Sequence, residues 1–386
     1  MQIVKTTAIF AFESHLPRLD LFWFSLIALL PFTVCFFWAV TFLLDGISRG
    51  WQAGRPLLCL FSAACAVLYM GHGWHFLQEG EAFSILDALY ASAHLAVFPI
   101  FLLYLYSIAS PRGVRPMQLL LLLPSAVALV LGLVVCFTGS NPSPVNFCSK
   151  FLFPPLLLYT LVAGHILLSR YNREVRNFYA DSEQKTMEPL SVLLWLLVVI
   201  SIISLVANYI GRDAFAARFP LAVPSLLFSA LLFSVMWVGA RLRFTAQDLS
   251  RDLGTTAQDV PAAQENPAAP QQPSGLMSRI DELVKERKIY RQHGLTVSDV
   301  AAAAGTNRTY VSNAINQQLG ISFSEYINRL RIEESKRIIS EADGKVVLSA
   351  VAEEAGFVSE ATFYRYFRRL EGKTPTEWWR EQAGRS

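Results

Sequence analysis

The chain has 386 residues, of which 53% are hydrophobic and only 16% charged, and its formal net charge is +3. Soluble domains carry about 25% charged residues, so this composition excludes an ordinary soluble protein over the whole length. The net charge is too small to indicate a nucleic-acid partner by itself. Nearly all of the excess hydrophobicity lies before residue 241, which divides the chain into an apolar N-terminal part and a polar C-terminal part.

The N-terminal part contains seven apolar windows that are long enough to cross about 30 Å of hydrocarbon as helices. They lie at about 21–44, 56–78, 88–111, 117–138, 148–170, 189–211 and 219–240. Helices of a soluble core keep a polar face, and these windows have none. The sequence therefore predicts an all-α fold in which residues 1–245 form a polytopic bundle of seven transmembrane helices.

Lys and Arg residues are distributed unequally between the connections that join these windows. With the N-terminus outside, the inward connections carry eleven of them and the outward connections five. This bias is in the direction of the positive-inside rule. We expect a multi-pass protein of a bacterial inner membrane, with a cytoplasmic C-terminus and the lipid bilayer as a partner.

The five cysteines all lie in the apolar part and form no CxxC pair, so we expect no structural zinc, no other metal site and no cofactor. Cys136 and Cys148 flank one short loop. They could form a disulfide if that loop faces outward, or remain two thiols.

Four polar residues at membrane depth are the candidates for sensing a signal: His72, His75, Asp87 and His94. Two interpretations are open. The residues could form an outward pocket for a small molecule, a proton or a metal ion, since histidine suits both proton and metal chemistry. Alternatively, they could make ordinary hydrogen bonds between helices.

Residues 246–275 lose apolar periodicity and are rich in Pro, Ala and Gln, which predicts a disordered linker. Its 22 central residues would reach about 25 Å on average. No phosphotransfer domain lies between the two parts, so a signal would pass through this linker.

The polar part contains two helix-turn-helix patterns. In the first, 297–304 is a short helix with small residues, Gly305 makes the turn, and Asn307 caps a recognition helix that extends to about Gln317. In the second, 348–355 is the support helix, Gly356 makes the turn and Ser359 caps a helix to about 370. A helix at 276–290 precedes both, and a long helix at 321–340 joins them.

This arrangement resembles the AraC/XylS family of transcription regulators. The matching segments are 319–331 (LGISFSEYINRLR), Ala355-Gly-Phe357, Ser359, Phe363, Phe367 and 372–378 (GKTPTEW). The resemblance covers about residues 276–382. It implies a two-lobed DNA-binding domain of seven helices, here taken as 276–386, with two recognition helices in successive major grooves of double-stranded DNA.

The residues expected to contact DNA lie on these two recognition helices. The first helix presents Arg308, Thr309, Ser312, Asn313 and Asn316; the second presents Ala361, Tyr364, Arg365, Arg368 and Arg369. Asn313 can pair with adenine and Arg365 with guanine, while Arg368 and Arg369 suit phosphates. The domain is barely basic, with 17 Lys and Arg against 15 Asp and Glu in residues 276–386. Its non-specific affinity should therefore be modest, and a homodimer or confinement at the membrane could compensate.

No enzyme motif is present in the sequence, and we expect no catalytic residue. The main hypothesis is a membrane-bound, sequence-specific transcription regulator that senses a signal through its bundle. Two alternatives are a transporter or channel whose tail regulates its own operon, and a bundle that only anchors the DNA reader. Transport would be supported by repeated halves with broken helices, and the sequence has no such symmetry.

Overall fold

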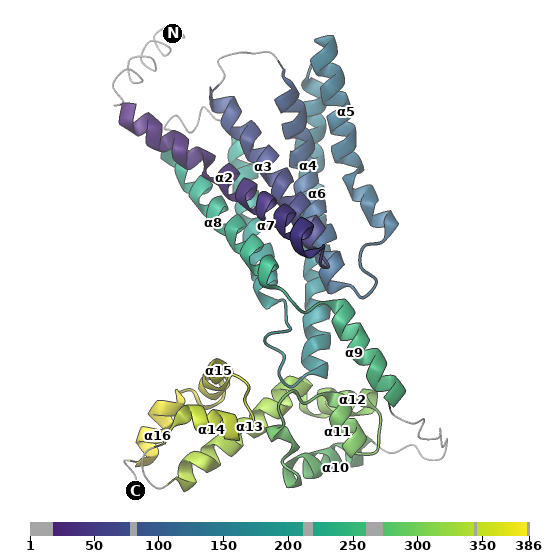
Figure 1. The fold of residues 1–386 in the computed structure, drawn as a ribbon, viewed down its shortest axis with the longest axis vertical. Helices are drawn as coiled ribbons and strands as arrows, with labels where there is room; N and C mark the ends of the chain where they lie inside the picture. Colours follow the sequence, from purple (N-terminus) through teal and green to yellow (C-terminus); the bar gives the residue numbers. More distant parts are fainter. Residues whose placement is uncertain (1–17, 78–82, 211–218, 260–272, 343–345, 384–386) are drawn as a thin grey trace. The chain divides into compact units, whose positions relative to one another are not determined.

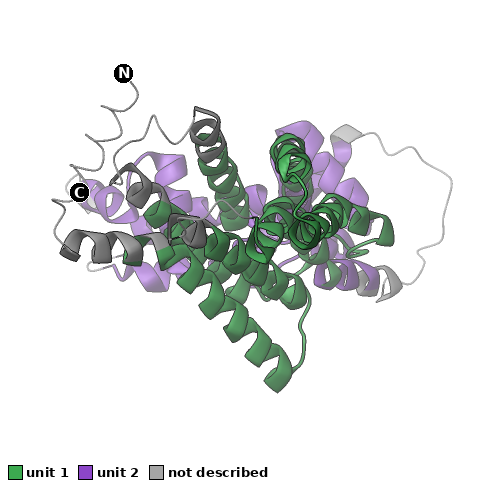
Figure 2. Cartoon of the chain, turned by 90° about the horizontal axis from the view of Figure 1, so that it is seen from above, with its two compact units in different colours: residues 1–168, 188–247 green, residues 169–187, 248–386 purple. Residues whose placement is uncertain are grey.

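The computed structural model describes residues 18–77, 83–210, 219–259, 273–342 and 346–383. Within these residues the secondary structure is helical, apart from an isolated antiparallel bridge between Tyr179 and Thr296 (Figure 1). The all-α prediction is therefore confirmed. The chain forms two compact units (Figure 2): unit 1 comprises residues 1–168 and 188–247, and unit 2 comprises residues 169–187 and 248–386.

Each of the seven predicted apolar windows falls on helix. The elements are α2 (Arg18–Arg49), α3 (Arg55–Leu77), α4 (Ile85–Ala109), η1 (Pro116–Leu122) with α5 (Leu123–Thr138), α6 (Ser143–Phe178), α7 (Glu188–Ile210) and α8 (Phe219–Arg241). The fourth window is a 3-10 segment followed by an α-helix, with a proline in the first turn of each piece. Proline lacks an amide donor and is best tolerated in a first turn, which explains the change of helix type at this point.

Unit 1 is built around α4. This helix packs against α3 and α5, and the middle of α4 is buried nearly all round. Helices α5 and α7 instead leave large apolar side chains on their outer faces; Phe137 of α5 is 78% exposed and Ile203 of α7 is 61% exposed. By length and composition, five helices in the described part of the chain could cross a membrane, and two further apolar helices, Arg55–Gly71 and Glu188–Ile203, are shorter.

Unit 2 contains a helical domain of two lobes. Its helices are α10 (Pro273–Glu286), η3 (Ile289–Arg291), α11 (Val297–Ala303), α12 (Arg308–Leu319), α13 (Phe323–Glu341), α14 (Leu348–Glu354), α15 (Glu360–Glu371) and α16 (Pro375–Ala383). Helices α10 to α12 pack together in the first lobe, and α14 to α16 surround a second core that includes Phe357, Phe363 and Phe367. Helix α13 contacts both lobes, as expected for the joining helix.

The organisation differs from the prediction in two places. Residues Ala246–Asp259, which we expected to be disordered linker, form helix α9. The reason is a short apolar repeat, Ala246, Leu249 and Leu253, of which the first two are buried. The central part of the predicted linker, residues 260–272, lies outside the described residues. Residues 169–187, counted with the N-terminal part in the sequence, belong to unit 2.

Candidate DNA-reading surface

The first helix-turn-helix is formed by α11 and α12. Thr296 and Asp299 form a reciprocal capping box at the start of α11, with the Thr296 amide donating to the Asp299 carboxylate over 2.7 Å. Gly305 makes the turn at a φ of 62°, which favours glycine. The side chain of Asn307 then caps α12 by accepting a hydrogen bond from the Tyr310 amide at 3.0 Å. The capping prediction for Asn307 is confirmed.

The predicted reading residues of α12 share its outer side, because Val311, Ala314 and Ile315 are buried. Thr309 and Asn313 are exposed, while Ser312 and Asn316 are half-buried and joined by a 3.2 Å hydrogen bond. Arg308 is also half-buried, and its guanidinium donates to the Leu253 carbonyl of α9 at 2.7 Å. Among the described residues, a hydrogen bond from outside the helix-turn-helix domain is thus recorded for Arg308 and for none of the other four.

The second helix-turn-helix is formed by α14 and α15. Gly356 turns the chain at a φ of 96°, and a Cβ atom there would lie only 2.6 Å from the Arg291 backbone of the first lobe. Only glycine allows this approach of the two lobes. Ser359 caps α15 by accepting from the Thr362 amide at 3.4 Å, and Phe363 and Phe367 point into the core.

The predicted reading residues of α15 are placed unequally. Ala361, Arg365 and Arg368 are exposed. Tyr364 is half-buried and packs partly against the second core. Arg369 is exposed but forms an ion pair with Glu325 and lies over the Tyr366 ring at 4.4 Å. Tyr364 and the three arginines line a surface hollow of about 440 Å³ together with Thr374.

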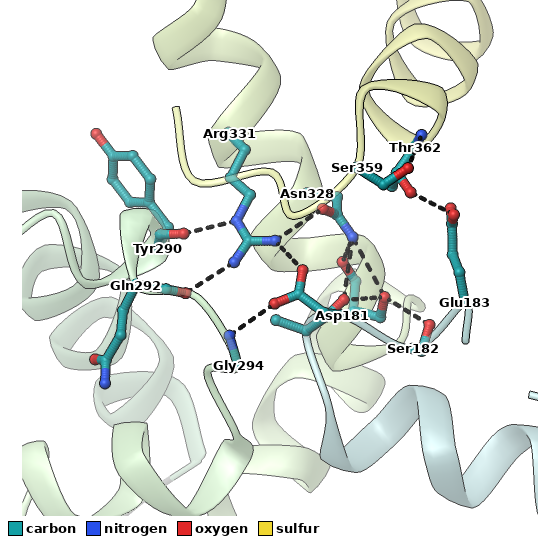
Figure 3. A network of polar contacts seen from close by, with 12 residues as sticks. Asp181, Ser182, Glu183, Tyr290, Gln292, Gly294, Asn328, Arg331, Ser359 and Thr362 are labelled. Carbon is teal, nitrogen blue, oxygen red and sulfur yellow. Dashed lines mark hydrogen bonds and ion pairs between the residues drawn. The ribbon is translucent and has the colours of Figure 1, made fainter. Parts of the chain in front are cut away.

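A buried polar network on α13 joins the two lobes, and sequence reasoning did not single out its members. Arg331 is fully buried and donates to the carbonyl oxygens of Tyr290 at 2.7 Å and Gln292 at 3.0 Å (Figure 3). One turn further on, the Glu334 carboxylate accepts from Arg337 at 2.9 Å and contacts Arg291 of η3. Hydrogen bonds from Arg337, Arg291 and Lys288 hold the pKa of Glu334 far below its usual range. The available signal was two charged residues, Arg331 and Glu334, on the face of the predicted helix that also carries Ile327 and Ile339.

Residues 179–183 also belong to this site, although they precede it by more than a hundred residues in the sequence. Asp181 forms a 2.6 Å ion pair with Arg331 and accepts from the Gly294 amide at 2.9 Å. Glu183 contacts Thr362 and Arg365 of α15. The sequence of this segment is typical of a polar loop, and its composition does not predict a contact with residues so distant in the chain.

The structure describes contacts for two of the four candidate sensing residues, Asp87 and His94. Asp87 accepts from the amide and hydroxyl of Ser84 at 2.7 Å, as the third residue of its own helix. The His94 ring stacks on Phe153 at 4.0 Å, and its Nδ1 lies 2.9 Å from the Ser149 hydroxyl. The side chains of His72 and His75 lie outside the described residues. Cys136 and Cys148 are free thiols.

Comparison with known proteins agrees with this geometry. Residues 300–381 match the family model described as "Helix-turn-helix domain". The HTH-type transcriptional regulator YisR of Bacillus subtilis is 32% identical over 83 residues, which are 22% of this chain and 28% of that protein. YijO of Escherichia coli is 32% identical over 106 residues, covering 28% of this chain and 36% of that protein.

A third relative, the probable transcriptional regulator LumQ of Photobacterium leiognathi, is 29% identical over 102 residues, which are 26% of this chain and 39% of that protein. The chain thus spans well under half the length of these three relatives. No solved structure gives a significant match. The C-terminal region is therefore a helix-turn-helix domain, similar to those of proteins named as transcriptional regulators.

Proposed function

We propose that the chain is a multi-pass inner-membrane regulator, with its N-terminus outside, that binds specific DNA sequences through a cytoplasmic C-terminal domain. The observation that carries the membrane part is the outer surface of unit 1. Side chains such as Leu120, Val130 and Phe137 are between 60% and 78% exposed on helices whose windows have a mean hydropathy of up to 2.8. Monomeric soluble proteins rarely expose such continuous apolar faces, whereas a bilayer covers them.

The make-up of unit 2 supports the proposed orientation. Residues 169–187 connect the fifth and sixth predicted spans, and they fold together with the helix-turn-helix domain. This connection and the C-terminal domain must therefore lie on the same side of the membrane. The positive-inside rule independently assigns this connection to the cytoplasm, because it carries Arg170, Arg173, Arg176 and Lys185.

Fusion reporters test the topology. A reporter that is active only outside the cytoplasm should be active when inserted after Ser140 and inactive when inserted after Ser182. The opposite pattern would overturn the orientation, and activity at neither or both positions would overturn the arrangement of spans between them.

The proposed reading residues are the exposed polar side chains of the two recognition helices, above all Asn313 and Arg365. The full chain in lipid nanodiscs would be incubated with a library of random-sequence DNA duplexes, and the retained DNA sequenced. We expect wild type to enrich a sequence with two half-sites about one helical turn apart. The double variant Asn313→Ala/Arg365→Ala should lose that preference, while Arg380→Ala, an exposed arginine on α16, should keep it. Unchanged preference in the double variant would show that other residues read the bases.

We also propose that the outward polar residues of unit 1 respond to a signal, with the proton as the first candidate. The His94 imidazole supports this, because it has a hydroxyl partner and two stacked rings, and such contacts change when the ring gains a proton. Reporter transcription would be followed between external pH 5 and 8. Replacing His72, His75, Asp87 and His94 together should abolish any response, and an unchanged response would exclude these residues as the proton sensor.

A further inference from the structure

The connection between α6 and α7 contains a five-residue segment, Tyr179–Glu183, which we term the docking segment. It lies across the helix-turn-helix domain within unit 2 (Figure 3). The Ala180 amide donates to the Leu295 carbonyl at 2.9 Å, and the Ala180 carbonyl accepts from the Ser324 hydroxyl at 2.8 Å. Tyr179, Ala180 and Ser182 are at most 5% exposed. Backbone pairing and deep burial distinguish this segment from a loop that merely touches a surface.

Asp181 fixes the docking segment to the centre of the domain. Its carboxylate accepts from Arg331 at 2.6 Å, and Arg331 has no exposed surface. A fully buried guanidinium is unfavourable unless a carboxylate and good hydrogen bonds compensate for its lost hydration. The helix-turn-helix domain thus uses a carboxylate from another part of the chain to satisfy the buried cation that joins its two lobes.

Two residues after Asp181, the docking segment reaches the second recognition helix. The Glu183 carboxylate accepts a hydrogen bond from the Thr362 hydroxyl and forms an ion pair with Arg365 (Figure 3 shows the Thr362 contact). Thr362 is in the first turn of α15, where the helix dipole also favours an anion. Glu183 therefore occupies a position beside the positive end of α15 that suits a negatively charged group.

The first recognition helix has a similar contact from outside the domain. Arg308, its only charged residue, donates to the Leu253 carbonyl of α9. Helix α9 is in turn joined to the docking segment by a hydrogen bond from the Tyr179 hydroxyl to the Asp252 carboxylate. One arginine on each recognition helix is thus engaged by this joined pair of segments.

We propose that the docking segment is an intramolecular partner of the DNA-reading surface and competes with DNA for the second recognition helix. The side of the Arg365 guanidinium that faces the Glu183 carboxylate in the ion pair cannot contact a guanine edge at the same time. A carboxylate beside α15 also repels the phosphates of an approaching duplex. The inference rests on the proposed reading role of Arg365. Helix α6 continues from its apolar part to Phe178, directly before the docking segment. A movement of α6 would therefore displace the docking segment on the DNA-binding domain without involving the linker.

The test compares two carboxylates of the same connection in the full chain in nanodiscs. Glu183→Gln removes the contact with Arg365, and Glu174→Gln removes an equal charge from an exposed position of α6. Affinity would be measured by fluorescence anisotropy on the duplex that the random library yields for wild type, or for Glu183→Gln if wild type yields none. We expect Glu183→Gln to bind about three- to tenfold more tightly than wild type, as loss of one competing ion pair implies. Glu174→Gln should bind like wild type, and in an Arg365→Ala background Glu183→Gln should give a smaller gain, because only the repulsion of phosphates is then relieved.

A second measurement detects displacement directly. Adding the selected duplex to wild type should accelerate hydrogen exchange at the Ala180 amide, because DNA would release the docking segment. Equal gains from Glu174→Gln and Glu183→Gln would overturn the proposal in favour of general charge repulsion. Unchanged affinity in Glu183→Gln together with unchanged exchange would also overturn it. If no variant selects any sequence from the library, the reading function itself fails, which is a different result.

Discussion

The two recognition helices differ in chemistry although they occupy equivalent places in their lobes. Helix α12 carries one charged residue, Arg308, and its other proposed reading residues have hydroxyl and amide side chains, whereas α15 carries Arg365, Arg368 and Arg369. Two of these arginines are paired with carboxylates, Glu183 and Glu325. The comparison indicates a division of roles, in which α12 supplies base contacts of low salt dependence and α15 supplies electrostatic contacts that carboxylates can oppose.

The paired arginines also explain how a weakly basic domain can be a DNA reader. Of the four basic residues on the two recognition helices, three lie on α15, and two of those three are paired with carboxylates of the protein. Affinity then depends on whether DNA phosphates displace those carboxylates. For this reason, the similar numbers of basic and acidic residues in the domain are compatible with sequence-specific DNA binding.

The largest effect is expected at Arg331, which bonds α13, the helix that contacts both lobes, to the first lobe. Arg331→Ala leaves Asp181 without its partner and removes bonds to two carbonyl groups of the first lobe. Breaking a buried pair in this way costs about 3–5 kcal/mol. Urea unfolding of the full chain, followed by hydrogen exchange in α12 and α15, should show both lobes destabilised. Arg329→Ala, a half-exposed arginine paired with Glu325 on the same helix, should cost less than about 1 kcal/mol. Similar losses for both variants would contradict the role given to Arg331.

The next largest effect is on base preference, which should change at different base pairs for variants of the two recognition helices. Arg365→Ala should cost about 1–3 kcal/mol of binding free energy and relax the preference at one base pair. Asn313→Ala should cost a similar amount at a different base pair, because an amide pairs with adenine. Titration of both variants against single-base changes of the selected duplex assigns each residue to its position. If both variants relax the same position, the two helices do not read separate half-sites.

A smaller effect is expected on the free energy of unfolding at acidic pH. The pKa of Glu334 is lowered by its bonds to Arg337, Arg291 and Lys288, so its ionised form stabilises the folded domain at pH values above the ordinary glutamate pKa of about 4.3. That contribution is lost as the pH falls through the lowered value. Glu334→Gln should therefore be about 1.5 kcal/mol less stable than wild type at pH 7. The difference in unfolding free energy between wild type and Glu334→Gln should shrink below about pH 4, because wild type then loses the stabilisation that its ionised carboxylate provides.

This pH dependence should be concentrated in the first lobe, since Arg291 and Lys288 belong to it. Hydrogen exchange at pH 7 should rise more in α12 than in α15 for Glu334→Gln. Equal changes in both helices would indicate that Glu334 stabilises the domain as a whole. A difference from wild type that stays constant down to pH 3 would exclude the ionised carboxylate as the cause.

The sequence predicted local features well and long-range partners poorly, for identifiable reasons. Apolar periodicity and caps such as Asn307 and Ser359 act within a few residues, so the helices and the two turns could be read directly. Helix α9 was not predicted because its apolar repeat consists of only three residues, Ala246, Leu249 and Leu253. The ion pairs of Asp181 and Glu183 could not be read, because a carboxylate on a polar loop carries no local mark of a partner 150 to 180 residues away. Arg331 and Glu334 were readable in principle, as charges on a buried helical face.

The smallest effect is expected at Arg368, and it tests the division between α12 and α15 most directly. Arg368 is exposed in the last turn of α15, one turn beyond the proposed base reader Arg365, so we expect it to neutralise a DNA phosphate. Arg368→Ala should then weaken binding to all sequences by a similar factor of less than about ten and reduce the slope of log affinity against log salt by about 1. Asn313→Ala should leave that slope unchanged, because an amide releases no counterion. A change of slope in Asn313→Ala, or none in Arg368→Ala, would mean that electrostatic binding is shared by both helices rather than carried by α15.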